Sequence, residues 1–176
     1  AEAGVARVSE RVDKVARYLT RFGTLVDELL DISRLSAGRL TLERAPLDLG
    51  EVVGELLARA SEELGRAGCE VSFRSAPGVV GRWDRLRIEQ IVTNLLSNAM
   101  KYGRGKPIDI DVDRDGDRVR LRVRDAGIGI SADDQARVFE RYERAVSSKH
   151  FGGLGLGLWI VRQLVDAHGG TIAVTS

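Results

Sequence analysis

The stretch IDIDVDRDGDRVRLRVRD, residues 108–125, alternates apolar and charged residues on both sides of an Asp-Gly pair. Alternation with a period of two is typical of a β-strand that buries one face. An Asp-Gly pair between two such runs is typical of a tight hairpin turn. Residues 108–125 therefore predict an antiparallel β-hairpin, and its apolar face needs a covering layer of other elements.

Upstream of the hairpin the sequence mixes helix and strand patterns. An amphipathic helix is expected over 49–66, short strands near 69–74 and 79–84, and a second helix over 85–102. The single cysteine, Cys69, is interpreted as a residue of the first short strand.

Downstream, the sequence predicts a short helix near 132–138, a polar loop, a glycine-rich turn that runs into a helix, and a last strand over 169–176. The elements on both sides of the hairpin predict an α+β fold. We expect a two-layer α/β sandwich with a mixed, mostly antiparallel sheet and helices on one face.

The first 35 residues carry a different pattern, in which apolar residues alternate spacings of three and four. This heptad pattern predicts a long helix that packs in a helical bundle; the alternative is an amphipathic helix that lies on its own domain. Gly38 and Pro46 are typical of the end of such a helix. We therefore expect a helical segment at 1–38, a linker at 39–47 and an α/β domain at 48–176. The residues of the pattern are Val5, Val8, Val12, Val15, Leu19, Phe22, Val26 and Leu29.

Composition excludes several classes of function. The chain of 176 residues has 27 Lys and Arg against 26 Asp and Glu, so its net charge of +1 gives no reason to expect a nucleic acid partner. One cysteine cannot form an internal disulfide or a thiolate metal cluster. The sequence shows no signal peptide and no membrane span, so we expect a soluble, cytoplasmic chain without direct membrane contact; membrane attachment of the intact protein is left open.

Two polar stretches flank the hairpin. In the helix expected at 85–102, Asn94, Asn98, Lys101 and Tyr102 fall along one side, where they either face solvent or line a site. After the hairpin, Asp125 leads into DAGIGI, residues 125–130. This stretch is either an ordinary Asp-Gly turn or a turn whose carboxylate accepts a hydrogen bond from a planar ligand such as a purine amine.

A third stretch, FGGLGLGLWIVRQL at 151–164, places glycines at the entrance of a helix. Glycines there allow backbone N–H groups to approach phosphate oxygens, and the helix N-terminus supplies a favourable partial charge. Gly155 and Gly157 are therefore predicted to contact phosphate. The stretch matches neither the P-loop pattern nor the dinucleotide-binding fingerprint.

The order of these stretches resembles the ATP-binding domain of sensor histidine kinases, in the superfamily that also contains gyrase, one chaperone class and the mismatch-repair ATPases. NLLSNAMKY at 94–102 resembles the N box, and DAGIGI resembles the first glycine box. VFERYERA at 138–145 resembles the F box, and GGLGLGLWIV at 152–161 the second glycine box. LVDELLDISRLSAGRL at 25–40 is similar to the second helix of the family's dimerisation hairpin.

For the polar helix and the first glycine box, the resemblance implies contacts with ATP and Mg²⁺. Asn98 is implied to coordinate Mg²⁺ with Asn94 beside it, and Lys101 and Tyr102 are implied to contact the phosphates and the nucleotide. Asp125 is implied to bind the adenine amino group. The two glycines implied to let the chain pass close to the base are Gly127 and Gly129.

For the second half of the site, the resemblance implies phosphate contacts. Arg144 is implied to reach the terminal phosphate, and residues 145–152 to form a short lid over the nucleotide. Leu154 stands where a Thr or Ser is often found and is interpreted as a tolerated variant. The glycines implied to line the triphosphate are Gly153, Gly155 and Gly157.

The resemblance implies a kinase that transfers the γ-phosphate of ATP to a histidine, acts as a homodimer through the N-terminal helix, and serves a response regulator receiver domain. Asn94 stands where hydrolysing relatives carry a glutamate, and an amide cannot accept a proton from water. The acceptor histidine is expected outside this chain, because neither His150 nor His168 lies on the heptad helix. We interpret His150 as a solvated loop residue and His168 as a helix C-terminal cap.

We further expect Trp83 and Trp159 to belong to the core, the chain to begin after the first hairpin helix, and the chain to end short of the last strand of the sheet.

Two functions other than that of a histidine kinase remain possible for this sequence. One is an ATPase of the gyrase or chaperone type, which needs a carboxylate at position 94. The other is a module that binds nucleotide or dimerises without catalysis.

Overall fold

The structure, a computed structural model, describes residues 11, 12, 15, 23, 40–143 and 155–176. The chain divides into two compact units, Ala1–Leu40 and Thr41–Ser176. In the first unit the four described residues before Leu40 are helical, and the rest of the predicted long helix lies outside the described residues. Among the helices that the structure describes, none combines the length and the apolar character needed to cross a membrane.

The second unit is built from five strands and four helices in the described part of the chain. The first half runs β1 (Ala45–Asp48), α2 (Leu49–Ala67), β2 (Val71–Ser75), β3 (Val80–Trp83) and α3 (Arg85–Tyr102). The second half runs β4 (Ile108–Asp115), β5 (Arg118–Asp125), α4 (Ala132–Gln135) and α5 (Gly157–Ala167).

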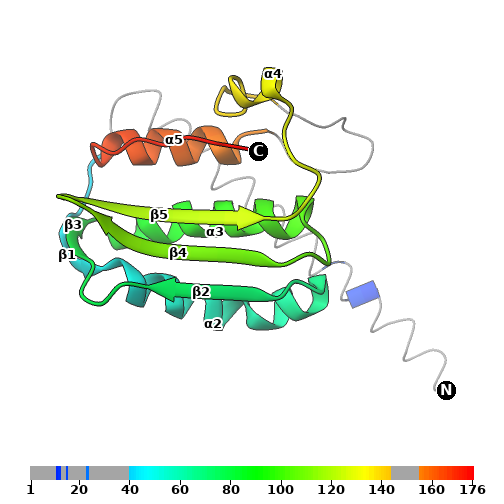
Figure 1. Ribbon diagram of the computed structural model, residues 1–176, viewed down its shortest axis with the longest axis horizontal. Helices are drawn as coiled ribbons and strands as arrows, with labels where there is room; N and C mark the ends of the chain where they lie inside the picture. The colour runs from blue at the N-terminus through cyan, green and yellow to red at the C-terminus, as the bar shows by residue number, and fades with distance from the viewer. Residues whose placement is uncertain (1–10, 13–14, 16–22, 24–39, 144–154) are drawn as a thin grey trace. The chain divides into compact units, whose positions relative to one another are not determined.

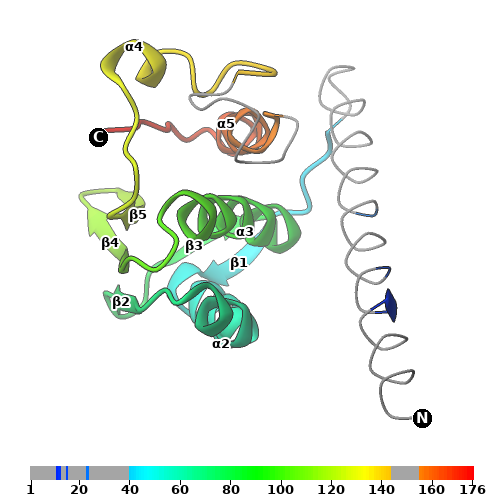
Figure 2. The ribbon, with the colours of Figure 1, turned by 90° about the vertical axis from the view of Figure 1, so that its right-hand side faces the viewer.

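The strands form two sheets (Figure 1). In the larger sheet β4 lies in the middle, parallel to β2 and antiparallel to β5. In the smaller sheet β1 pairs antiparallel with β3. Helices α2, α3 and α5 lie side by side on one face of the larger sheet, with α3 between the other two (Figure 2). The unit is therefore a two-layer α/β sandwich.

Strand β4 supplies the centre of the core. Ile108, Ile110 and Val112 are almost completely buried on the face that the helices cover. Side chains alternate across a strand, so the intervening residues of β4 point to the opposite face. The helices meet this apolar face with one buried stripe each, in which Val53, Val92 and Ile160 are completely inaccessible to solvent.

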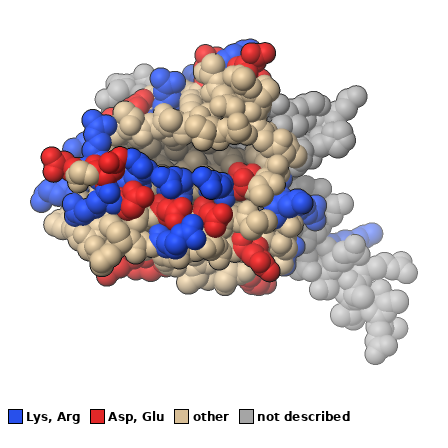
Figure 3. Space-filling model, viewed as in Figure 1, with Lys and Arg blue, Asp and Glu red and all other residues tan. Residues whose placement is uncertain are grey.

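The opposite face of the larger sheet is charged (Figure 3). The pairing register sets Arg122 of β5 opposite Asp111 of β4, and each other arginine of β5 likewise stands opposite an aspartate. From the other side, Arg74 of β2 hydrogen-bonds Asp111 at 2.8 Å, and this bond raises the pKa of the Arg74 guanidinium. Because a slip of one residue would exchange the apolar and charged faces, these cross-strand pairs and the buried face specify the same register.

The sequence signals at chain reversals have clear structural causes. Gly116 adopts φ 62° in the hairpin turn, a value that glycine reaches without strain. Asp48 caps α2 by accepting hydrogen bonds from the backbone N–H groups of Gly50 and Glu51. The same helix ends at Gly68, which has φ 70° and donates its N–H to the last turn.

The predicted fold class, the helices at 49–66 and 85–102, and the hairpin are confirmed. The segment 39–47, for which a linker is expected, includes most of β1, because Ala45–Asp48 pairs with β3, which is distant in sequence. Two details of the predicted elements are wrong. Cys69 is buried but precedes β2. The helix expected near 132–138 is a single turn, Ala132–Gln135.

The expected final strand is also not formed. In Thr171–Ser176 the half-buried Ile172 and Val174 alternate with exposed residues, as a strand pattern requires. However, the segment forms no backbone ladder with β5 in the described structure, where β5 pairs with β4 alone. Alternation fixes which side chains face the core, but a strand also needs hydrogen bonds to a neighbouring backbone.

The buried face of β4 should dominate the stability of this unit. We expect Ile110→Ala to lower the free energy of unfolding by about 2–5 kcal/mol, because it leaves a cavity beneath the helices. Denaturant unfolding followed by circular dichroism measures this loss. Leu86→Ala is the matched control, since Leu86 is 67% exposed; an equal loss from both variants would show that β4 is not the centre of the core.

Candidate functional site

Helix α3 carries the polar residues of the candidate site next to its buried stripe. Ile91, Val92, Leu96 and Ala99 are buried, whereas Asn94, Asn98, Lys101 and Tyr102 are half-buried. Residues four apart in a helix lie one above the other, so Asn94, Asn98 and Tyr102 form one row along α3. These side chains are half-buried, whereas the alternative interpretation, in which they simply face solvent, required them to be fully exposed.

The first part of this row faces the start of α5. A Cβ atom on Gly157 would lie 3.0 Å from Asn94 Oδ1 and 4.0 Å from Asn98 Nδ2. Asn94 donates a hydrogen bond from Nδ2 to the carbonyl oxygen of Gln90 at 3.0 Å, so the amide group is held with Oδ1 toward Gly157. The structure thus brings two predicted groups together, the asparagines of α3 and a glycine of the second glycine box.

The end of the row faces the first glycine box. Ile128 donates its backbone N–H to the carbonyl oxygen of Tyr102 at 3.4 Å. A Cβ on Gly127 would meet this same carbonyl and would lie 2.6 Å from Asp125 Oδ1, so only glycine fits there without a shift. The turn is therefore seated directly on the C-terminal end of α3.

Asp125 itself lies in an Asx turn. Its Oδ1 accepts the N–H of Gly127 at 2.9 Å, and the side chain is exposed at the end of the edge strand β5. Each carboxylate oxygen can accept more than one hydrogen bond. The exposed carboxylate therefore keeps acceptor capacity for a ligand group. Gly129, at φ 70°, completes the turn.

Among the residues that the structure describes, none caps the start of α5 with its side chain. Leu156 occupies the N-cap position and makes no capping hydrogen bond, although the first N–H groups of a helix have no partner within the helix. Gly155 has φ 71°, and its carbonyl oxygen accepts the N–H of Tyr142 at 3.2 Å. Within the described part of the chain, backbone donors at the start of α5 are thus left without a side-chain cap, beside Asn94.

Lys101 lies at the edge of this arrangement. Its Nζ donates to the Tyr102 hydroxyl at 2.9 Å and lies 4.6 Å from the centre of the Tyr102 ring. Arg144, Gly153, Leu154, His150 and the expected lid 145–152 lie outside the described residues. The structure therefore brings together the predicted groups of α3, the first glycine box and Gly155–Gly157, and the predictions for the segment between 143 and 155 stay predictions.

The remaining aromatic and histidine predictions have mixed outcomes. His168 is the C-cap residue of α5, as expected. Trp83 and Trp159 are half-buried and do not belong to the fully buried core. The Trp159 ring lies 5.3 Å from the guanidinium carbon of Arg141 and forms a cation–π contact with it. The sequence around Trp159 does not predict this contact.

The described residues contain a pocket of about 310 Å³ at the opposite end of α3. Glu43, Asp84 and Glu89 contribute three carboxylates to its wall, together with Arg85 and Leu86. These carboxylates would repel a triphosphate, so the pocket is a poorer candidate for a nucleotide site than the glycine-rich arrangement. No group of three or more acidic, histidine or cysteine side chains that could hold a metal ion occurs among the described residues.

Sequence reasoning missed the role of Asp84. This residue is 7% exposed and caps α3 by accepting the N–H of Arg87 at 3.2 Å. An aspartate directly before a helical pattern is a known start signal and could have identified this cap. Its second hydrogen bond, from the N–H of Glu43 at 2.9 Å, joins residues 41 positions apart, and no local pattern indicates it.

Comparison with known proteins agrees with the geometry. Residues 83–176 match the family described as "Histidine kinase-, DNA gyrase B-, and HSP90-like ATPase". The chain is 34% identical over 179 residues to signal transduction histidine-protein kinase BarA of Escherichia coli K12, covering 95% of this chain and 19% of BarA. It is 35% identical over 167 residues to the sensor-like histidine kinase SenX3 of Mycobacterium tuberculosis H37Rv, covering 93% of this chain and 41% of SenX3.

A solved structure gives the same result. Full-length ShkA in complex with AMPPNP superposes with a TM-score of 0.77 at 31% identity, covering 87% of this chain and 32% of ShkA. The chain thus spans about a fifth of BarA and about two fifths of SenX3. The family match includes α3, the hairpin, both glycine boxes and α5. Both named relatives are histidine kinases. The chain therefore belongs to the histidine kinase, DNA gyrase B and HSP90-like ATPase family.

Proposed function

We propose that this chain binds ATP with Mg²⁺ and is the catalytic part of a sensor histidine kinase that transfers the γ-phosphate to a histidine. The observation that carries the proposal is the row on α3, which meets Gly157 at Asn94 and the Asp125–Gly127 turn at Tyr102. Both ends of a nucleotide thus have complementary groups along one helix: a carboxylate for the base, and backbone donors for the phosphates.

Asp125 is proposed to accept a hydrogen bond from the adenine amino group, with Gly127 and Gly129 giving the base room beside the backbone. Gly153, Gly155 and Gly157 are proposed to receive the triphosphate. In support, Leu156 leaves the donors at the start of α5 without a side-chain cap. A bound triphosphate would take the place of a cap and would gain from the helix dipole.

Asn98 is proposed to hold Mg²⁺ through its amide oxygen, a hard ligand of the kind this ion prefers. The half-buried position of Asn98 near Gly157 fits such a ligand next to the phosphates. When bound, Mg²⁺ would neutralise charge on the phosphate oxygens. Lys101 and Tyr102 are proposed to contact the nucleotide from the end of the row, and Arg144 to contact the terminal phosphate.

The proposed reaction is attack by an imidazole nitrogen on the γ-phosphorus. A P–N bond forms, the bond from the γ-phosphorus to the bridging oxygen breaks, and ADP leaves with the electron pair. Asn94 supports transfer rather than hydrolysis, because its Nδ2 already donates to Gln90 and its amide cannot accept a proton from water. This argues against an ATPase of the gyrase or chaperone type.

The proposal extends to the organisation of the intact protein. Residues 1–38 are proposed to be the second helix of a dimerisation hairpin, 39–47 a linker, and 48–176 the ATP-binding domain. The partners proposed are a second copy of the chain, bound through the N-terminal helix, and a response regulator receiver domain. We propose a cytoplasmic location for this part of the protein.

The adenine assignment predicts the effect of Asp125→Asn. This change removes the charge from the acceptor and should weaken ATP binding by about 1.5–3 kcal/mol, the range for loss of a charge-assisted hydrogen bond. Titration calorimetry measures the affinity. Asp133→Asn makes the same chemical change on the exposed α4 and should bind like the parent chain; parent-like binding by Asp125→Asn as well would place adenine elsewhere.

The metal assignment predicts that Asn98→Ala abolishes the dependence of ATP binding on Mg²⁺, because only the oxygen ligand is lost and the buried stripe of α3 is kept. Binding curves with Mg²⁺ and with EDTA provide the measurement. Ser97→Ala, at an exposed position of the same helix, is the control and should keep the full dependence. Full dependence in Asn98→Ala would move the metal ligand to another residue.

The kinase and ATPase proposals differ in what the chain does with bound ATP. We expect binding without self-labelling and without appreciable phosphate release, because Asn94 cannot act as a base. Addition of a separate polypeptide that carries the acceptor histidine on a dimerisation helix should produce an acid-labile, base-stable phosphoprotein. Sustained phosphate release by the chain alone would favour a hydrolase, and labelling at His150 or His168 would show that the acceptor lies within the chain.

A further inference from the structure

The C-terminal end of α5 is tied to the segment through which the chain enters the second unit. Arg44 donates a hydrogen bond from Nη2 to the carbonyl oxygen of Ala167 at 2.7 Å, across 123 positions of sequence. Ala167 is the last residue of α5, so its carbonyl has no partner within the helix. A guanidinium at this end also complements the negative end of the helix dipole.

A second tie joins the same end of α5 to the start of α3. The backbone N–H of Asp84 donates to His168 Nε2 at 3.2 Å, and His168 Nδ1 lies 2.8 Å from the carbonyl oxygen of Leu164. With Nε2 as the acceptor, the imidazole is neutral and Nδ1–H donates to Leu164. The buried carboxylate of Asp84 accepts N–H groups from both Glu43 and Arg87.

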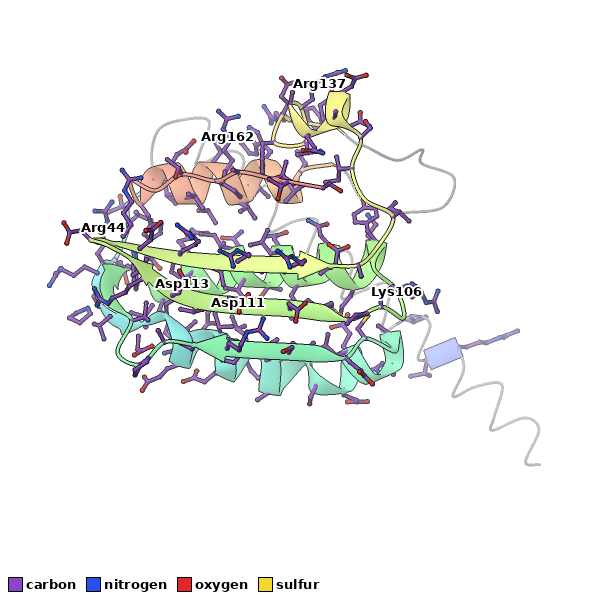
Figure 4. The ribbon with its side chains drawn as sticks, in the orientation of Figure 1. Arg44, Lys106, Asp111, Asp113, Arg137 and Arg162 are labelled. Carbon is purple, nitrogen blue, oxygen red and sulfur yellow. The ribbon has the colours of Figure 1, made fainter. Side chains whose placement is uncertain are left out.

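These bonds form one cluster, which we name the α3–α5 brace and which consists of Glu43, Arg44, Asp84, Ala167 and His168. The brace connects three segments: residues 43–44, the start of α3 and the end of α5. Figure 4 shows Arg44 near the end of the molecule where α5 finishes, and Arg162 on the outer side of α5.

The brace and the candidate site lie toward opposite ends of the same pair of helices. The start of α3 contacts the end of α5, so the two helices run antiparallel. Gly157, at the other end of α5, therefore lies next to Asn94. Gly157 and Ala167 are about 15 Å apart along a rigid helix. If Ala167 is held in place, the position of Gly157 along the axis of α3 is also fixed. This position matters because a Cβ atom on Gly157 would lie only 3.0 Å from Asn94 Oδ1.

We propose that Arg44 is a positioning residue for the nucleotide site, acting through α5; this inference rests on the proposed function. By holding Ala167, Arg44 fixes the place of the glycine turn relative to Asn94 and Asn98. Arg44 also lies four positions after Leu40, the last residue of the first unit. A change in the path of residues 41–44 would thus alter the affinity for nucleotide through α5.

The test compares three variants in the full chain. Arg44→Ala should weaken the binding of ATP with Mg²⁺ by about threefold to tenfold, the scale of one lost hydrogen bond. Arg44→Lys keeps a charged donor and should recover most of the affinity. Arg162→Ala removes a guanidinium from α5 that pairs with Asp166 on the same helix, and it should bind like the parent.

Fluorescence gives a second readout that a purely local role of Arg44 would not change. Trp159 lies in the first turn of α5, at the end opposite Ala167. In a Trp83→Phe background, where Trp159 is the remaining tryptophan, Arg44→Ala should shift the Trp159 emission. Arg44→Lys should restore the parent spectrum, and Arg162→Ala should leave it unchanged.

Failure of this inference is distinguishable from failure of the proposed function. If Arg44→Ala binds like the parent while Asp125→Asn and Asn98→Ala show their expected losses, the site is correct and Arg44 does not position it. Equal weakening by Arg44→Ala and Arg162→Ala would also overturn the inference, since it would indicate a general effect of lost positive charge and not the loss of the bond to Ala167. A parent chain that does not bind nucleotide would overturn both.

Discussion

Helix α3 buries one face in the core and carries a row of polar side chains on the adjacent face. The rest of the structure depends on this separation of apolar and polar residues on one helix. Its buried side, with Ile88, Ile91, Val92, Leu96 and Ala99, holds the helical layer together between α2 and α5. The row of Asn94, Asn98 and Tyr102 occupies the adjacent side at one-turn intervals. Because both sides belong to one rigid element, packing of the core also determines the geometry of the candidate site.

This arrangement explains why the glycines fall where they do. Gly157 allows the start of α5 to approach Asn94, and Gly127 allows the first glycine box to sit on the Tyr102 carbonyl. A side chain at either position would separate the two segments from α3. The glycine-rich stretches therefore serve close contact with α3 as well as the proposed approach of a nucleotide.

Features with a local physical cause could be predicted from the sequence. The observed bounds of α3, Arg85–Tyr102, match the expected range, since an aspartate precedes the apolar pattern and Gly103 follows it. The hairpin was predictable because its alternation and its Gly116 turn lie within 18 residues of sequence. The candidate residues Asn94, Asn98, Asp125 and Gly157 were recognisable as separate polar or glycine-rich stretches, and the family resemblance gave their order a meaning.

What could not be predicted depends on contacts between distant residues. Strand β1 exists because Ala45–Asp48 pairs with β3, and β2 pairs in parallel with β4 across a connection that contains both β3 and α3; neither pairing has a local signature. The bonds of Asp84 to Glu43 and to His168 join segments 41 and 84 positions apart. The closeness of Asn94 to Gly157 is a property of helix packing, which a one-dimensional pattern does not contain.

The central claim is that the row on α3 is one wall of an ATP site, and a crystal structure of the chain with a non-hydrolysable ATP analogue and Mg²⁺ tests it most directly. The account predicts adenine at Asp125, the triphosphate at the glycine turn before α5, and the Asn98 amide oxygen among the ligands of Mg²⁺. Nucleotide density away from α3, or along α3 without contact to Asp125 and Asn98, would contradict the account.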